Sequence, residues 1–212
     1  MKFLLINGSP KANGNTFHAC DFIKKKLEAQ GIETEIYNLA NKTFNPCLGC
    51  RSCFNNQNLK CVINDDLSDL IANCQDIDGI ILGSPIHYAD IAGIAKNAFD
   101  RLFYVSSANG NIFRHKVGAS FVVVRRAGGI AGFQTLNNYL LYSEMFIASS
   151  TYWNIVYGAT PEEIYCDAEG TSTLECLANN LAYLAKSLKE STLAKPPVVE
   201  KIRTNFVRDD LK

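Results

Sequence analysis

The chain has 212 residues, of which 47% are hydrophobic and 20% charged; this composition is typical of a globular domain and excludes a disordered chain. Basic and acidic residues number 21 each, so no charge excess favours nucleic acid or an anionic membrane as a partner. No apolar run approaches the roughly 18 residues that span a bilayer, and the first residues do not resemble a secretory signal. We therefore expect a cytoplasmic protein with one sizeable domain.

Apolar runs and helical patterns alternate along the chain. Residues 3–6 are continuously apolar, as in a strand that is covered on both faces. Residues 15–30 carry a helical apolar stripe that Gly31 ends, and residues 32–39 alternate as in a strand at a sheet edge. The same reasoning predicts further strands at 77–82, at 117–124 and between 146 and 157, and helices at 66–75, 91–104, 130–144 and 172–190.

This alternation predicts an α/β fold with a parallel sheet and helices on both faces. Five strands fit a doubly wound, flavodoxin-like sheet with the order 2-1-3-4-5. We expect one domain over residues 1–192, with a cysteine-rich insertion at 41–64. Residues 193–212 form a tail without a helical pattern, which either packs on a partner subunit or is mobile. The ligand of such a sheet binds at the carboxyl ends of the strands, near the switch point between strands 1 and 3.

The loop that follows the first strand, residues 8–16, has a composition suited to an anion. Two glycines permit close backbone approach, the next helix begins here with its positive dipole end, and Lys11 adds a positive charge. The spacing matches neither a nucleoside triphosphatase loop nor a Rossmann dinucleotide site. A turn capped by Asn13 or Asn15 is the alternative interpretation. The side chains that offer donors are Ser9, Asn15 and Thr16.

Two further loops follow the third and fourth strands. In residues 83–88, Pro85 stiffens a turn that offers backbone amides and the ring of Tyr88 to a flat heterocycle, while His87 is equally a plain loop histidine. Residues 125–129 combine two arginines with two glycines. The glycines allow a planar ligand to approach the backbone and the arginines attract a negatively charged cosubstrate; the alternative is a plain turn with solvated arginines. On the helix between these loops, Asp100–Arg101 is interpreted as a surface charge pair.

Four of the eight cysteines lie close together in the insertion. Their spacing, Cys47-x2-Cys50-x2-Cys53-x7-Cys61, is one that iron-sulfur clusters use. Zinc, a redox-active dithiol and small buried packing residues remain alternatives. We expect the remaining cysteines to be core residues; they are Cys20, Cys74, Cys166 and Cys176.

The three loops and the cysteine spacing together resemble the flavodoxin-like NAD(P)H-dependent FMN reductases, and more narrowly their iron-sulfur flavoprotein branch. The resemblance covers roughly residues 1–160, with Lys11 where the family usually has arginine and His87 where it usually has tyrosine. It implies that the FMN phosphate is held by Ser9, Lys11, Asn13, Asn15 and Thr16. It implies that the isoalloxazine ring is bordered by Pro85, Ile86, His87, Tyr88, Ala127, Gly128 and Gly129. A [4Fe-4S] cluster would be held by Cys47, Cys50, Cys53 and Cys61.

The resemblance implies an FMN-dependent oxidoreductase in which NAD(P)H or ferredoxin supplies electrons to a quinone-like or other small acceptor. It indicates no dedicated acid-base residue. One alternative is an iron-sulfur flavoprotein that acts as an electron carrier or redox sensor between proteins. Another is a flavodoxin-like fold that has lost its cofactor and binds a partner protein. By analogy we expect a homodimer or homotetramer, with an aromatic interface formed from Tyr139, Tyr142, Phe146, Tyr152 and Trp153.

Overall fold

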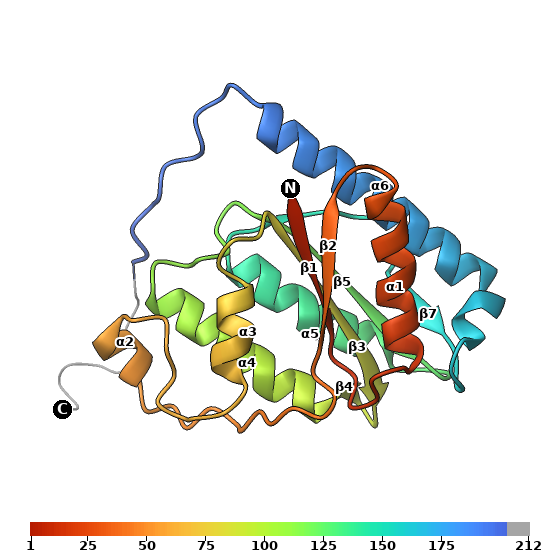
Figure 1. Ribbon diagram of the computed structural model, residues 1–212, viewed down its shortest axis with the longest axis horizontal. Helices are drawn as coiled ribbons and strands as arrows, with labels where there is room; N and C mark the ends of the chain where they lie inside the picture. The colour runs from red at the N-terminus through yellow and green to blue at the C-terminus, as the bar shows by residue number, and fades with distance from the viewer. Residues whose placement is uncertain (203–212) are drawn as a thin grey trace.

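The computed structural model of the protein describes residues 1–202. A mainly parallel sheet lies between two layers of helices (Figure 1). The strands are β1 (Lys2–Asn7), β2 (Glu33–Asn38), β3 (Gly79–His87), β4 (Asp90–Ile91), β5 (Val117–Val124), β6 (Phe146–Ile147) and β7 (Ile155–Tyr157). The helices are α1 (Asn15–Glu28), α2 (Ser52–Asn56), α3 (Leu67–Asn73), α4 (Gly93–Ala108), α5 (Gly129–Tyr142), the 3-10 helix η1 (Glu163–Cys166) and α6 (Ala168–Glu190).

The strand order β2-β1-β3-β5-β6 confirms the predicted flavodoxin-like arrangement. The fifth position is divided, because β6 pairs with the start of β5 and β7 pairs with its end. Between them the side-chain amide of Asn154 donates to the carbonyl of Ser120 at 2.8 Å, in place of a strand hydrogen bond. The single strand expected between 146 and 157 is therefore two short strands.

Alternate residues of the strands enter two separate cores. On β1, Leu4 and Ile6 pack with the helices α3, α4 and α5, whereas Phe3 and Leu5 pack with α1 and α6. Figure 1 shows α1 and α6 together on one side of the sheet. Both faces of β1 are thus removed from water, which is why its sequence is a continuous apolar run.

Strand β3 extends further than the sequence pattern indicated. It continues to His87 and forms a short hairpin with β4, so residues 83–87 are strand and not the predicted loop. Ser84 supports this extension, because its hydroxyl accepts the N–H of Ala92 at 3.1 Å and donates to the carbonyl of Pro85 at 2.9 Å. The extended strand carries the hairpin beyond the carboxyl edge of the sheet.

The C-terminal segment follows α6 along the molecule without forming a helix or strand as far as residue 202. The remainder of the predicted tail, residues 203–212, lies outside the described residues. Within residues 1–202, no helix combines the length and the apolar character needed to cross a membrane.

Candidate functional site

Asn7, the last residue of β1, shapes the loop that follows it. Its side chain is buried; Oδ1 accepts the N–H of Ser9 at 3.2 Å, and Nδ2 donates to the carbonyl of Ala12 at 3.3 Å and to Oδ1 of Asn38 at 2.6 Å. One buried amide therefore connects the ends of β1 and β2 to both halves of the loop. This fixes the backbone of residues 8–14 before any ligand binds.

The start of α1 is not capped by a side chain. Gly14 occupies the N-cap position in an extended conformation, and no side-chain hydrogen bond closes the helix end. The alternative of a cap by Asn13 or Asn15 is thus wrong. The first N–H groups of an uncapped helix carry positive partial charge and suit an anion such as phosphate.

The donors predicted in this loop differ in their exposure. The side chains of Ser9, Asn15 and Thr16 are buried, while Lys11 and Asn13 are exposed. Buried hydroxyl and amide groups need partners, whereas an exposed lysine is solvated until a ligand arrives. The loop therefore combines three buried polar side chains, which we call the polar floor of the site, with two exposed side chains.

Asn15 has an incomplete set of partners. Its Nδ2 donates to the carbonyl of Thr160 at 2.6 Å, but its buried Oδ1 has no hydrogen-bond partner among the described residues. A buried acceptor without a donor costs about 1–3 kcal/mol. The ribityl hydroxyls of the FMN that the sequence resemblance implies are donors of the required kind, so the chemistry of this loop fits that cofactor.

The first loop is joined directly to β3. The N–H of Gly8 donates to the carbonyl of Gly83 at 2.8 Å, and a Cβ built on Gly8 would lie 2.5 Å from that oxygen. Only glycine allows this contact. The polar loop after β1 and the extended end of β3 consequently meet at the switch point between the two strands.

The ends of β3 and β5 also meet. Ile86 packs against the start of α5, where a Cβ on Gly128 would lie 3.4 Å from its Cγ2 and a Cβ on Gly132 would lie 2.2 Å from its Cδ1. Gly128 has φ of +88°, a conformation that favours glycine. The residues predicted to border a ring are thus neighbours: Pro85 and Ile86 are half-buried, His87, Tyr88, Ala127 and Gly128 are exposed, and Gly129 is buried.

A fourth loop, after β7, completes this edge and was missed by the sequence analysis. Glu163 accepts the N–H groups of Ala159 and Thr160 at 2.6 and 3.0 Å and the hydroxyl of Thr160 at 2.6 Å. These bonds, chiefly the one from the Thr160 hydroxyl, lower the pKa of Glu163 to about 2. The pattern Thr160-x-x-Glu163 is the sequence signature of a helix capping box and could have revealed the loop.

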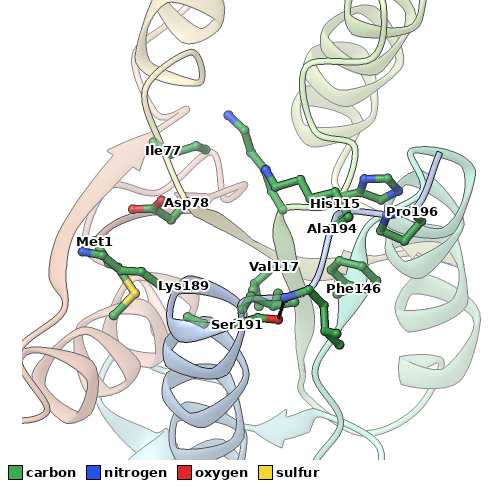
Figure 2. A pocket seen from close by; sticks show the side chains of 15 residues that line it. Met1, Ile77, Asp78, His115, Val117, Phe146, Lys189, Ser191, Ala194 and Pro196 are labelled. Atoms are coloured by element: carbon green, nitrogen blue, oxygen red, sulfur yellow. Dashed lines mark hydrogen bonds between the residues drawn. The ribbon is translucent and has the colours of Figure 1, made fainter. Parts of the chain in front are cut away.

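Two cavities of about 550 Å³ lie at opposite edges of the sheet. One is at the carboxyl edge, where its lining includes Arg125, Tyr157 and Cys166. The other is at the amino edge, where Met1, Asp78 and Val117 face residues of the C-terminal segment (Figure 2). The residues predicted to hold FMN line neither of these cavities. The candidate site is placed at the carboxyl edge because the first loop, the end of β3 and the start of α5 meet there, as the topology requires.

The cysteine-rich insertion packs along one face of α4. From the start to the end of that helix, Asn97 donates to the carbonyl of Phe44 at 3.0 Å, Tyr104 meets the ring of Phe54 at 5.0 Å, and Asn109 accepts the N–H of Leu59 at 3.0 Å. Asn97 and Tyr104 are seven residues apart and so lie on the same face of α4, whereas Asn109 is the C-cap that follows the helix. The beginning, middle and end of the insertion therefore all pack against α4 or its C-cap.

Within this insertion all four clustered cysteines line one small cavity. Cys47 and Cys50 are exposed, Cys61 is half-buried, and Cys53 is buried on the short helix α2, which the sequence did not predict. Burial raises the pKa of Cys53, and the neighbouring thiols of Cys61 and Cys47 raise it further. Residues 1–202 contain no group of three or more Cys, His, Asp or Glu side chains in an arrangement that could already hold a metal ion. The thiols thus converge on one cavity without adopting a coordination geometry.

The other four cysteines do not all behave as expected. Cys20 and Cys74 are buried core residues, and burial raises their thiol pKa values. Cys176 is half-buried, and Cys166 is exposed at the carboxyl edge, so the expectation of a core position is wrong for Cys166. It is the last residue of η1, in which Ile164 is the buried side chain.

Arg101 also corrects the sequence analysis, which placed it in a surface charge pair with Asp100. Arg101 is 1% exposed and pairs instead with Asp65, whose side chain is also 1% exposed, at 2.5 Å. Asp100 pairs with Lys96 and accepts the hydroxyl of Tyr139, each at 2.5 Å. The true partner of Arg101 lies 36 residues away, beyond the reach of local patterns.

Residues 1–160 match the model of a protein family described as NADPH-dependent FMN reductase. An iron-sulfur flavoprotein of Methanocaldococcus jannaschii is 32% identical over 197 residues, which cover 90% of this chain and all of that protein. An iron-sulfur flavoprotein of Archaeoglobus fulgidus is 29% identical and covers 90% of this chain and 94% of its own. An FMN-dependent NADPH-azoreductase of Staphylococcus aureus is 29% identical over 65% of this chain and 66% of its own.

Solved structures share the fold at low identity. RosB, crystallised with a bound riboflavin-phosphate intermediate, superposes with a TM-score of 0.69 at 16% identity and covers all of this chain and 94% of its own. A WrbA-like flavodoxin of Agrobacterium tumefaciens gives a TM-score of 0.60 at 14% identity, over 88% of this chain and 97% of its own. These likenesses confirm the flavodoxin-like fold.

Proposed function

Because the chain belongs to the NADPH-dependent FMN reductase family, within its iron-sulfur flavoprotein branch, it is an oxidoreductase, and we propose that it passes electrons from NAD(P)H or ferredoxin through FMN to a quinone-like or other small acceptor. The observation that carries this proposal is the meeting of the loops after β1, β3 and β5 at the switch point, joined by the bond from Gly8 to Gly83. We place this activity in the cytoplasm, in agreement with eight free cysteines.

The residues of the first loop have the chemistry to hold the phosphate and ribityl chain. Ser9 and Thr16 offer hydroxyls from the polar floor, Lys11 and Asn13 approach from solvent, and Asn15 offers its unpartnered oxygen. When bound, FMN supplies the electron-transfer chemistry that side chains lack. The chain's own residues would therefore bind and orient the cofactor.

The ring would lie against the hairpin and the α5 N-terminus, bordered by the seven residues named above. Exposed neighbours at His87, Tyr88 and Ala127 leave one side of that position open to solvent. NAD(P)H is oxidised to NAD(P)⁺ by giving up a hydride, and a quinone-like acceptor gains that hydride's two electrons and proton plus one proton from water. Donor and acceptor would use the same open side in turn.

Replacing Lys11 by alanine tests the phosphate assignment. The loss of a charge-assisted contact is expected to weaken FMN binding by about 1.5–3 kcal/mol, or roughly 10- to 150-fold. Fluorescence titration of the apoprotein with FMN measures the change. Lys26→Ala is the control, because Lys26 pairs with Glu175 at the other end of α1 and should leave the affinity unchanged. An unchanged affinity in Lys11→Ala would mean that backbone and hydroxyl groups alone hold the phosphate.

A second candidate function, an electron carrier or redox sensor with a [4Fe-4S] cluster, is favoured by the four cysteines that line one cavity. Protein purified anaerobically should contain FMN with about four irons and four sulfides per chain. The Cys53→Ser variant should lose the iron and keep the FMN. The control is Cys74→Ser, which changes a buried cysteine outside the cavity and should keep both.

The electron donor separates the two candidate functions. Fast reduction of the protein by NADH or NADPH supports the reductase, whereas reduction by ferredoxin alone supports the electron carrier. FMN without iron would contradict the cluster, and protein that binds no FMN would contradict both functions.

We also propose a homodimer or homotetramer with an interface around Tyr152 and Trp153. These rings are 60% and 51% exposed, and such aromatic surface is typical of interfaces. Tyr139, by contrast, is half-buried and hydrogen-bonded to Asp100 within the chain. Light scattering is expected to give a multiple of the 23.4 kDa chain mass, and Trp153→Ser should lower it. A monomeric wild-type mass would overturn this proposal.

A further inference from the structure

The buried guanidinium of Arg101 connects both ends of the cysteine-rich segment. Its Nη1 donates to the carbonyl of Asn45 at 3.2 Å, ahead of the first cysteine, and to Asp65 at 2.5 Å. Its Nη2 donates to the carbonyl of Ile63 at 3.3 Å, behind the last cysteine. One side chain of α4 thus closes the base of the segment that carries all four thiols.

The third nitrogen of this guanidinium has no such partner. Nε of Arg101 is buried and makes no hydrogen bond to the described residues, although the side chain lines the cavity together with the four cysteines. Burial alone lowers the pKa of Arg101, but the hydrogen bond with Asp65 raises it above the ordinary value, so the guanidinium stays charged. A neutral thiol is a weak acceptor, whereas a thiolate or sulfide is a strong one. The unpaired donor is therefore matched to anionic sulfur at this position.

Resting on the proposed cluster, we infer that Arg101 is a positioning residue for it: the Nε–H donates to anionic sulfur in the cysteine cavity and so favours the reduced cluster. The effect does not come from net charge, because Asp65 balances the guanidinium. It comes from the orientation of the ion pair, because the positive partner, Arg101, lines the cavity and the negative partner, Asp65, does not. Hydrogen bonds to cluster sulfur make the added electron more favourable.

The test is a redox titration of the anaerobic holoprotein, followed by electron paramagnetic resonance. In Arg101→Lys and Arg101→Gln the equilibrium constant for cluster reduction should fall about tenfold, which is about 59 mV for one electron. The FMN potential should not change. Arg114→Gln is the matched control, because it removes an arginine from an exposed ion pair with Glu144 and should leave both potentials unchanged. A cluster in Arg101→Lys with the wild-type potential would overturn the inference.

A second measurement covers variants that fail to retain iron. Reduced wild-type protein labelled with ¹⁵N only at arginine Nε should show hyperfine coupling between that nitrogen and the cluster. The coupling should persist in Arg51→Lys, which removes the other arginine that lines the cavity. Cluster-containing wild-type protein without this coupling would overturn the inference and leave the proposed cluster standing. Wild-type protein that binds FMN without iron or sulfide would overturn both.

Discussion

Replacing Asp65 by asparagine is expected to lower the free energy of unfolding by about 3–5 kcal/mol, because it leaves the buried charge of Arg101 without a counter-ion. The size of the side chain is kept, but its negative charge is lost and one of its two acceptor oxygens becomes an NH2 donor. Asp65 also accepts both N–H groups of Asn45, at 2.9 and 3.0 Å, so the start of the cysteine segment should loosen as well. Urea unfolding at neutral pH measures the loss.

The same pair gives the wild-type protein an acid-sensitive component of stability. Burial by itself raises the pKa of Asp65, but the hydrogen bonds from Arg101 and Asn45 outweigh it and lower the pKa from 3.8 to about 2. When the pKa of a carboxyl group is lower in the folded than in the unfolded protein, the ionised group stabilises the fold at pH values above the unfolded-state pKa. This stabilisation is lost as the pH falls through the folded-state pKa. About 2 kcal/mol should therefore disappear between about pH 4 and pH 2.

Asp66→Asn is the matched control for both experiments. Asp66 is the adjacent carboxylate, which accepts the N–H of Thr43 at 2.6 Å but has a 38% exposed side chain 4.0 Å from Lys42. Exposed pairs contribute about 1 kcal/mol or less, so this variant should unfold close to the wild type. Equal losses in the two variants would show that the burial of the Arg101–Asp65 pair has no special energetic role.

Replacing Gly8 by alanine is expected to disrupt the close backbone contact between the first loop and β3. The new Cβ would lie 2.5 Å from the carbonyl oxygen of Gly83 and 2.9 Å from the Cβ of Ala95, and neither can move freely. Overpacking and the strained Gly8–Gly83 hydrogen bond together should lower the free energy of unfolding by about 2–4 kcal/mol. FMN binding should weaken at the same time, which a titration of the apoprotein measures.

Gly14→Ala is the control within the same loop. Its new Cβ would lie 3.4 Å from the nearest atom, Cβ of Lys11, and Gly14 has a φ of −84° that any residue can adopt. Glycine is preferred to alanine at an N-cap, so this variant should lose about 1 kcal/mol, less than Gly8→Ala. If Gly8→Ala bound FMN as tightly as Gly14→Ala, the close approach of the two strands would not be needed for the site.

The sequence predicted those features of the fold that depend on residues close together in the chain. The apolar run of β1, the stripe of α1 and the glycines after β5 each report on their own neighbourhood, and the parallel connections then limit the sheet order. The cysteine spacing likewise indicated that four thiols could meet. Local patterns predicted the loops after β1 and β5, because the ends of these strands are marked by turn residues.

Contacts between distant segments could not be predicted in this way. Nothing near Arg101 indicates that Asp65 reaches it, so the usual preference of adjacent opposite charges for the surface gave the wrong answer. The extension of β3 depends on Ser84 accepting an N–H from Ala92 beyond the turn. The bond from Asn15 to Thr160 spans 145 residues and has no signature in either segment.

That last bond has a kinetic consequence. Asn15 begins the first helix of the domain, yet its side chain is oriented by a carbonyl that follows the final strand. Closing so long a loop costs conformational entropy that is recovered only when β7 docks on β5. The polar floor for the cofactor should therefore be completed late in folding. During synthesis, a nascent chain whose strands β1 to β5 have left the ribosome would contain most residues of the site. It would still lack the hydrogen bond to Thr160 that orients the side chain of Asn15.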